Sequence, residues 1–420
     1  MRQRLVSLLL LAVLAAPSAA LAADAGATYR FLEELYNRFD RTLQPYLISE
    51  LEQYLAVYPA GARADRALYL LGRTYEDAGD RHAALAAYAK LLYLYPSSDE
   101  RAAALDALRA ILGREKFYAD QRGRLEALLR EADGSGSRAD RHYAYLSFLS
   151  KLDATHLHER LLAECTTFKR DYPLDSRLPH LDLWIAVSWA NKGGSLESAQ
   201  AFRKFEALYP DDPSLPYARY TRAELLSREL NGGQQAISIL RGLVASFPDS
   251  RYAPRALFLL GETQARLKDF KQAIADYRRL ADEYAADEAA PAALLAAAEI
   301  QERQLKDLPA AVATLKELPE RFPGDARGVE ALERAATLET QRLGDHRSAA
   351  ATFASVADYF PQHERAAECL LKAGKLHEEK TGDLQAALAT YRLALERYPG
   401  DRKAGELGRR ADHLSKRLGG

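Results

Sequence analysis

Hydrophobic residues recur at helical spacing along most of the chain. Leu68, Leu71 and Tyr75, for example, lie three and four residues apart, which places them on one face of a helix. A polar break follows, and its Asp80 is a residue type that caps a new helix by accepting backbone N–H bonds. A second helix then runs to an aromatic-proline pair, because proline can neither continue a helix nor donate a hydrogen bond there. The pattern predicts helical hairpins and no strands.

An aromatic-proline pair ends most of the predicted hairpins at a regular interval. Successive prolines of this series lie 37, 77, 37, 38, 75, 38 and 38 residues apart. The two long gaps are doubled periods, and Gly134 and Ala285 stand where a proline is expected. The spacing predicts ten repeats and a polar capping helix over 401–417. The repeats are expected to end near Pro59, Pro96, Gly134, Pro173, Pro210, Pro248, Ala285, Pro323, Pro361 and Pro399.

Two repeats carry the same residue types at the same offsets. They are Leu68, Leu71, Gly72, Tyr75, Ala84, Tyr88 and Pro96 in the second repeat, and Leu257, Leu260, Gly261, Ala273 and Tyr277 in the seventh. This pattern resembles the tetratricopeptide repeat (TPR), whose usual length is about 34 residues. The resemblance implies an all-α, TPR-like α-solenoid, a right-handed superhelix of about ten hairpins in which Gly and Ala mark the close approach of paired helices. We attribute the longer period to longer linkers between repeats.

The long repeats resemble those of periplasmic TPR proteins of the BamD and CpoB types. BamD-like proteins carry a lipidated cysteine, and CpoB-like proteins carry an N-terminal coiled coil; we find neither feature in this sequence. The resemblance implies a scaffold for protein-protein interactions in cell-envelope biogenesis, in outer-membrane assembly or cell-division coordination. It is specific for the fold and does not identify a partner.

The third and fourth repeats depart from the pattern. Arg122 stands where a small alanine is expected, and Gly134-Ser135-Gly136-Ser137 replaces the terminating proline. Gly/Ser runs are flexible, so the segment could act as a hinge. Because four residues are few for a hinge, we favour a surface turn.

The first 22 residues have the three regions of a secretory signal peptide. Arg2 and Arg4 form a basic start, the apolar run 5–16 follows, and small residues precede a cleavage site after Ala22. A membrane anchor is the weaker alternative, because spanning a bilayer takes about 20 apolar residues. No cysteine follows the site, so the expected product is an unlipidated periplasmic solenoid over 23–420, which could lie at the outer membrane.

Composition and motifs argue against several function classes. The formal net charge of −1 gives no basic excess for nucleic acid, and we find no catalytic, nucleotide-binding or cofactor-binding motif. We therefore expect a protein that is not an enzyme and has no cofactor or metal. The cluster His156-Leu157-His158-Glu159 is interpreted as surface histidines at a helix start. Cys165 and Cys369 are expected to be buried free thiols, because six repeats separate them.

The remaining candidate site is a surface. In TPR-like arrays the first helix of each hairpin lines the concave wall, and the repeat register transfers that role to three hairpins. The candidate residues are Arg66, Tyr69, Arg73, Tyr217, Tyr220, Glu224, Arg255, Phe258 and Glu262. Aromatic anchors beside selective charges are typical of peptide-binding surfaces. The alternative is that these aromatic rings only pack against adjacent helices.

Two functions remain open. The first is a scaffold that holds envelope proteins or extended peptide segments. The second is a glycan binder in peptidoglycan or polysaccharide export, with tyrosines stacked on sugar rings. Sugar binding would favour exposed tryptophans, whereas the helical phase of Trp184 and Trp189 indicates packing. The scaffold is therefore the leading hypothesis.

Overall fold

The computed structural model describes residues 18–38, 41–59, 61, 63–130, 132–152 and 154–419. The predicted signal-peptide segment through Pro17 lies outside these ranges, and the predicted cleavage point after Ala22 falls within helix α2 (Ser18–Arg38). The chain folds as two compact units, one ending at Tyr209 and the other beginning at Pro210.

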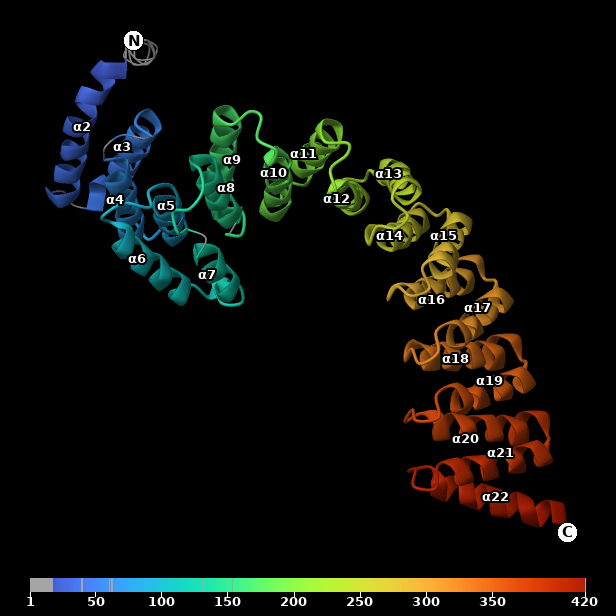
Figure 1. The fold of residues 1–420 in the computed structure, drawn as a ribbon. Coiled ribbons are helices and arrows are strands. Elements are labelled where there is room, and N and C mark those ends of the chain that lie inside the picture. The colour runs from blue at the N-terminus through green and yellow to red at the C-terminus, as the bar shows by residue number, and fades with distance from the viewer. Residues whose placement is uncertain are drawn as a thin grey trace. The chain divides into compact units, whose positions relative to one another are not determined.

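The N-terminal unit contains five helical hairpins in its described part (Figure 1). Two short 3-10 turns, η2 (Arg41–Leu43) and η3 (Lys116–Tyr118), precede α3 and follow α6. The paired helices are α2 with α3 (Gln44–Val57), α4 (Ala64–Asp77) with α5 (Arg81–Leu94), α6 (Arg101–Arg114) with α7 (Arg122–Arg130), α8 (Arg138–Leu149) with α9 (Ala154–Asp171), and α10 (Leu178–Lys192) with α11 (Ser195–Leu208).

The C-terminal unit contains five more hairpins and a last helix, α22 (Ala404–Gly419). Three first helices end in π-helical turns, which are η4 (Gln301–Leu305), η5 (Glu339–Leu343) and η6 (His377–Thr381). The paired helices are α12 (Leu215–Arg228) with α13 (Gly233–Ser246), α14 (Tyr252–Arg266) with α15 (Phe270–Glu283), α16 (Ala290–Ile300) with α17 (Leu308–Arg321), α18 (Arg327–Leu338) with α19 (His346–Tyr359), and α20 (Ala366–Leu376) with α21 (Leu384–Arg397).

Ten hairpins and a capping helix confirm the predicted all-α architecture. No strand occurs in the described ranges. The cap follows from the sequence of α22, whose Leu407, Ala411 and Leu414 recur every three or four residues and are buried in the cluster shared with α21. Its other positions are mainly charged or polar, so the end of the array presents a wettable face.

The helix boundaries follow the capping residues found in the sequence. The side chain of Asp80 accepts the Ala83 N–H at 2.9 Å, and Asp307, Asp345 and Asp383 make the same bond at the start of their helices. Asp269 occupies the equivalent position with similar backbone angles but makes no side-chain bond. These caps satisfy N–H groups that lack partners in the first turn of a helix.

Glycines mark the close approach of paired helices, as the repeat pattern implies. A Cβ atom on Gly261 would lie 2.5 Å from the ring of Tyr277, and one on Gly374 would lie 2.2 Å from the ring of Tyr391. Gly72 has the same relation to Tyr88. A side chain on the first helix would therefore displace the tyrosine that fills the centre of the hairpin.

The difference between 37- and 38-residue repeats lies inside the hairpin. The linker between hairpins stays short, such as the segment 284–289 between α15 and α16. In the 37-residue repeats the Asp269 N–H reaches back to the carbonyl of Gln264, whereas in the 38-residue repeats the Asp345 N–H reaches the carbonyl of Glu339. The extra residue of the 38-residue repeats therefore lies in the turn within the hairpin, which becomes π-helical. The length of the linkers between hairpins does not predict this position.

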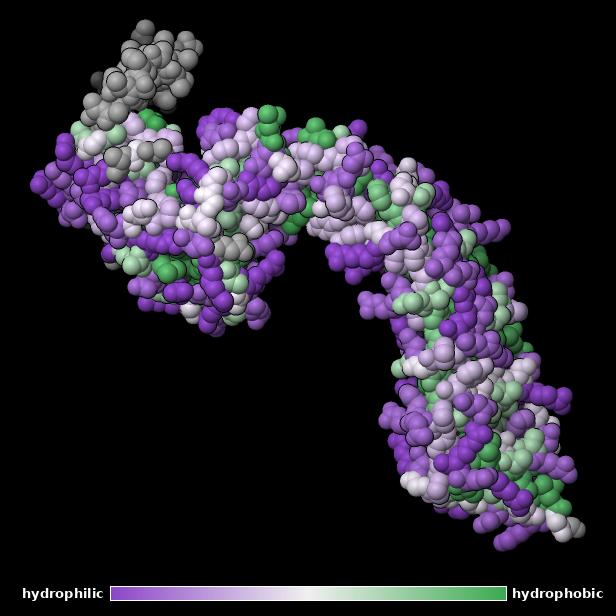
Figure 2. All heavy atoms as spheres, in the orientation of Figure 1, coloured by the Kyte–Doolittle hydropathy of each residue, from purple (hydrophilic) through white to green (hydrophobic). Residues whose placement is uncertain are grey.

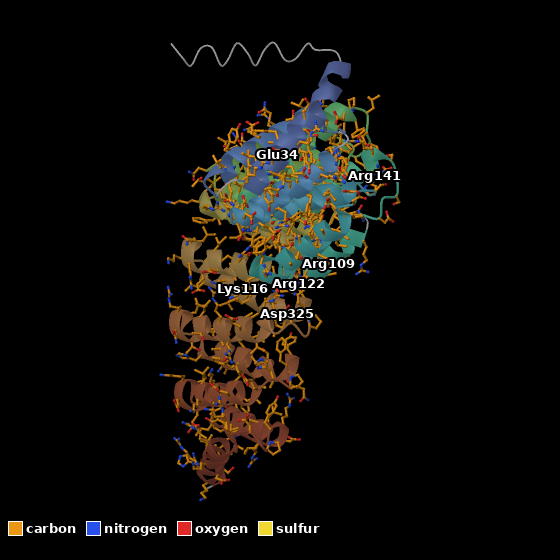
Figure 3. The ribbon with its side chains drawn as sticks, turned by 90° about the vertical axis from the view of Figure 1, so that its left-hand side faces the viewer. Glu34, Arg109, Lys116, Arg122, Arg141 and Asp325 are labelled. Atoms are coloured by element: carbon orange, nitrogen blue, oxygen red, sulfur yellow. The ribbon has the colours of Figure 1, made fainter. Side chains whose placement is uncertain are left out.

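The third hairpin interrupts the regular stacking of neighbours. Helix α5 packs against α6 and also contacts α8 and α9 of the fourth hairpin. Arg122 starts the short helix α7 and donates hydrogen bonds to the carbonyls of Leu112 and Gly113 at 3.2 Å, so it caps the end of α6. Figure 3 shows Arg122 near Arg109 and Lys116 in this part of the molecule.

The Gly134–Ser137 segment forms a turn packed against the second hairpin. Gly134 has a φ of +87°, and a Cβ there would lie 2.6 Å from Pro96. Ser137 and Asp140 cap α8 reciprocally, with the Asp140 N–H donating to the Ser137 hydroxyl at 3.1 Å and the Ser137 N–H donating to Asp140 at 2.9 Å. This geometry supports the turn interpretation.

Hydrophobic side chains fill the space between successive helices. Leu257 and Leu260 of α14 are buried in one such cluster of the C-terminal unit. On the face shown in Figure 2, hydrophilic side chains predominate in each unit and hydrophobic groups are scattered. Cys165 and Cys369 are buried free thiols, as expected, and burial raises the pKa of each to about 12. Among the described helices, none combines the length and apolar character needed to cross a membrane.

Candidate protein-binding surfaces

Six of the nine predicted wall residues lie on two first helices that contact each other. On each helix the three residues are spaced by three and four positions, so they share one face. The structure thus brings these six together in the C-terminal unit, whereas the other three lie on α4 of the N-terminal unit. The six are Tyr217, Tyr220 and Glu224 on α12, and Arg255, Phe258 and Glu262 on α14.

The aromatic residues of this wall are half-buried. The Tyr220 ring lies 5.7 Å from that of Tyr252, and the Phe258 ring lies 5.4 Å from that of Tyr277. Tyr220 and Phe258 both pack against the buried cluster between α12 and α16. Each ring therefore contributes to packing on one side and keeps part of its surface accessible. The packing and anchoring roles are both compatible with this geometry.

The charged residues of the wall connect the two helices. The exposed Arg228 pairs with Glu224 at 3.2 Å on its own helix and with Glu262 at 3.0 Å on α14. Arg255 is exposed on the same face of α14. Exposed ion pairs stabilise little, so these groups remain available to exchange partners with a bound protein.

The three predicted residues on α4 have local partners. Arg66 lies 3.5 Å from Asp99, and the Tyr69 ring lies 5.9 Å from that of Tyr88. A hydrogen bond with Tyr69 raises the pKa of Arg73. These three residues form a separate small patch on α4, with partners in the neighbouring hairpins.

Tyr252, which is not among the predicted wall residues, lies between the two predicted groups. It is the first residue of α14, and its ring lies 5.7 Å from both Tyr217 and Tyr220. Burial raises the pKa of Tyr217 and of Tyr220, so both phenols stay protonated at neutral pH and can donate hydrogen bonds. The position of Tyr252, two residues before the periodic Pro254, was the available signal.

The N-terminal unit contains a cavity that the sequence pattern does not predict. It has a volume of about 570 Å³ and lies between α3, α4, α5 and α9. Its apolar lining includes Leu55, Leu71 and Ala87, and charged groups stand among them. The cavity exists because the displaced third hairpin lets α9 approach the first two hairpins. A pattern of repeats that contact only their neighbours gives no sign of such a contact.

An ion pair between a half-buried lysine and a buried glutamate borders this cavity. Lys90 Nζ donates to Glu164 Oε1 at 2.5 Å, and His142 Nε2 lies 3.5 Å from Glu164 Oε2. Burial alone would raise the pKa of Glu164, but the charge of Lys90 and the nearby His142 outweigh it and lower the pKa to about 2. Glu164 is therefore ionised at neutral pH although it is buried, with only 9% of its surface exposed.

A half-buried arginine joins the fourth hairpin to the first two. Arg160 on α9 donates to Glu52 at 3.0 Å and to the Tyr75 hydroxyl at 2.7 Å, and its guanidinium lies 5.3 Å from the centre of the Tyr75 ring. Burial lowers the pKa of Arg160, but the nearby Tyr75, Tyr145 and Glu52 outweigh it and raise the pKa. These charged groups are already paired, so they fix α9 in place and do not select a ligand of one charge.

The expectation of surface histidines is wrong for one of the two. His156 is exposed, and its ring stacks on that of His82 at 4.6 Å. His158 is buried, hydrogen-bonds Ser188 at 2.9 Å and lies 3.9 Å from the Trp189 ring. Burial is the main cause that lowers the pKa of His158. The fifth hairpin covers this residue, which local sequence alone cannot show.

Tetratricopeptide-repeat family models match four segments of the sequence. One matches residues 66–98 and 292–325, and a second matches 225–288 and 339–402. The matched segments contain the whole of α5, α14, α17 and α21. They also contain part or all of the helices next to these four. The irregular hairpins between α6 and α11 lie outside the matches. A search of curated proteins gave no match.

Solved structures with similar repeats share little sequence with this chain. A tetratricopeptide repeat protein from Parabacteroides merdae is 16% identical, with 69% of this chain and 98% of that chain covered and a TM-score of 0.35. The C-terminal part of a TPR repeat-containing protein from Cytophaga hutchinsonii is 13% identical, with 63% and 98% covered and a TM-score of 0.38. The P58(IPK) TPR domain is 15% identical, with 94% and 99% covered and a TM-score of 0.28.

The family matches coincide with the hairpins in which glycine meets tyrosine. Gly72, Gly261 and Gly374 all lie in matched segments, and each faces a tyrosine of the second helix. The all-helical array and the capping helix extend the same architecture through the rest of the described chain. The chain therefore carries tetratricopeptide repeats and folds as a TPR-like α-solenoid.

Proposed function

We propose that this protein is a non-catalytic scaffold that holds other proteins of the bacterial cell envelope. The observation that carries the proposal is the wall on α12 and α14, where half-buried aromatic rings keep an accessible side next to exposed, exchangeable charges. Rigid aromatic anchors surrounded by polar groups are typical of protein-binding surfaces. The BamD-like and CpoB-like resemblance supports a role in outer-membrane assembly or cell-division coordination.

The proposed location is the periplasm, without a lipid anchor and at most peripheral to the outer membrane. The basic start, the apolar run 5–16 and the small residues before Ala23 support export and cleavage. We expect osmotic shock to release a protein whose first residue is Ala23. Recovery only from detergent-extracted membranes, with residues 1–22 still attached, would contradict this location.

A photo-crosslinking experiment tests the wall. A benzoylphenylalanine placed at the exposed Arg255 should yield a discrete protein adduct in cells, because it lies beside the proposed anchors. The same probe at Tyr359 on α19, which is 42% exposed and lies on a second helix, is the matched control and should yield none. Equal adducts from both positions would show non-specific capture and refute the wall.

A pair of substitutions then separates anchoring from packing. Tyr220→Ala with Phe258→Ala should reduce the adduct yield by about tenfold or more, as expected for hot-spot residues. Thermal melting should fall modestly, because both rings also contact the core. If the folded double variant gives the normal adduct, the rings only pack and the proposed anchors are wrong.

Glycan binding remains the second candidate function, because three tyrosines lie close together at the start of the wall. In that case the adduct formed from Arg255 would contain sugar and would shift in mass on glycosidase treatment. A purely protein adduct would favour the scaffold.

A further inference from the structure

A pocket of about 460 Å³ opens beside the first turns of α12 and α14. One side carries Pro213, Pro216 and Tyr217, and the other carries Arg251 and Tyr252. The rings of Tyr217 and Tyr252 lie 5.7 Å apart and are tilted by 52°. At this separation the two rings contact each other, so they form one continuous apolar surface in the pocket, which is called the slot below.

The position of Tyr252 makes this slot a local feature of the array. The repeat register places Ser214, Ala289, Arg327 and Arg365 at the equivalent position of neighbouring hairpins. Among the described hairpins of the C-terminal unit, the two tyrosines therefore face each other across the first turns at this place. A feature produced by the repeat itself would recur at each hairpin. The slot is therefore specific to this pair of hairpins.

Hydrogen-bond donors surround the slot. Arg251 donates to the Tyr252 hydroxyl at 2.8 Å, which leaves the hydroxyl proton to donate to another acceptor. The Ser250 hydroxyl accepts the Tyr252 N–H at 3.3 Å, so its proton can also be donated outward. A polyproline II segment has no internal hydrogen bonds, and its carbonyl groups need donors of this kind.

The lining of the slot carries a positive charge. Its lining contains Arg251 and no carboxylate, and the exposed Arg255 follows one turn later on α14. Sugar-binding sites typically use carboxylates to accept hydrogen bonds from hydroxyl groups, and none lines this pocket. An acidic group on the ligand would instead complement the arginines.

We infer that this slot binds an extended, proline-rich segment of a partner protein that carries an acidic residue next to its prolines. Proline rings would pack on the accessible parts of the Tyr217 and Tyr252 rings, backbone carbonyls would accept hydrogen bonds from Tyr252 and Ser250, and the acidic residue would pair with Arg251. The preformed polyproline II conformation limits the entropy lost on binding to a shallow pocket. The inference rests on the scaffold function and assigns it a partner chemistry.

Fluorescence anisotropy tests the inference with a labelled peptide of consecutive prolines around one central glutamate. The full-length protein should bind it more tightly than a matched peptide in which alanines replace the prolines. Tyr252→Ala should weaken binding by about tenfold or more, and Tyr252→Phe should weaken it less because the ring remains. Tyr359→Ala on α19 should leave binding unchanged. Circular dichroism verifies that each variant is folded.

A charge exchange provides the decisive comparison. Arg251→Glu should weaken binding of the glutamate peptide by about tenfold. The same variant should bind a peptide with lysine at the central position more tightly than the wild type does. A general loss of structure would weaken both peptides and could not produce that gain.

Three results would overturn the inference. They are equal binding of the proline and alanine peptides, no binding by the folded wild type, and Tyr252-dependent binding of an oligosaccharide in place of the peptide. If the Arg255 crosslink still forms in any of these cases, the scaffold survives and only the proline-rich partner is wrong. If the crosslink also fails, the scaffold itself is wrong.

Discussion

Replacing Lys90 with methionine should destabilise the N-terminal unit by about 3–5 kcal/mol at neutral pH. The substitution leaves the Glu164 carboxylate buried without the ammonium group that lies 2.5 Å from it. In the wild type, the pKa of Glu164 falls from its ordinary value of 4.5 to about 2, despite the opposing effect of burial. The lowered pKa means that ionised Glu164 stabilises the folded state at pH 7.

The pH dependence of this effect has a definite sign. Because the folded pKa of Glu164 lies below the unfolded value, its contribution is present above pH 4.5 and is lost as the pH falls from 4.5 towards 2. In Lys90→Met, burial should raise the pKa of Glu164, so the carboxyl becomes neutral in mild acid. Urea unfolding should therefore show a large difference between variant and wild type at pH 7.5 and a much smaller one near pH 4.

The double variant Lys90→Met with Glu164→Gln is the matched control. Removing both charges avoids an unpaired buried ion, so it should recover most of the stability lost in the single variant. A Lys90→Met protein that is as stable as the wild type at pH 7.5 would show that this pair does not hold α9 against α5.

Tyr391→Ala should destabilise the tenth hairpin by about 3–5 kcal/mol, because the ring is fully buried and its loss leaves a cavity. Gly374→Ala should also destabilise it, by about 1–2 kcal/mol, because the new Cβ would lie 2.2 Å from the ring of Tyr391. The gain in helix propensity, up to about 1 kcal/mol, offsets part of that clash.

The two substitutions combined should cost less than their sum. Once the ring is absent, the methyl group of Gly374→Ala has room, and a favourable coupling of about 1 kcal/mol or more is expected. Chemical denaturation measures the free energies, and amide hydrogen exchange over residues 366–397 localises them. Gly242→Ala on α13 is the control, since nothing lies within 4 Å of its added Cβ, and it should stabilise by about 0.5–1 kcal/mol. Strict additivity would contradict the close approach of α20 and α21.

The wall could be predicted in part because it depends on position within a repeat. Tyr220 and Phe258 occupy equivalent places one period apart, and the register alone put them on the same face of successive first helices. Their half-burial could not be predicted, because it depends on Tyr252 and Tyr277, which approach from the next hairpin or the paired helix.

Which of the two histidines is buried could not be predicted from the local sequence. His156 and His158 are two residues apart, so they point to different sides of α9. Which side is covered depends on α10, whose Ser188 and Trp189 meet His158. A lone repeat contains no information on that neighbour.

The sequence by itself determined the elements of this protein and their number. Helical periodicity, aspartate caps, terminating prolines and the glycine-tyrosine pairs act within one hairpin, over a few turns of chain, so a linear pattern records them. The tertiary structure decided how the irregular third hairpin is accommodated. Contacts such as Arg160 with Glu52 join residues 108 positions apart. They depend on the three-dimensional path of α6 and α7, which no periodic spacing encodes, and they create both the cavity and the buried Lys90–Glu164 pair.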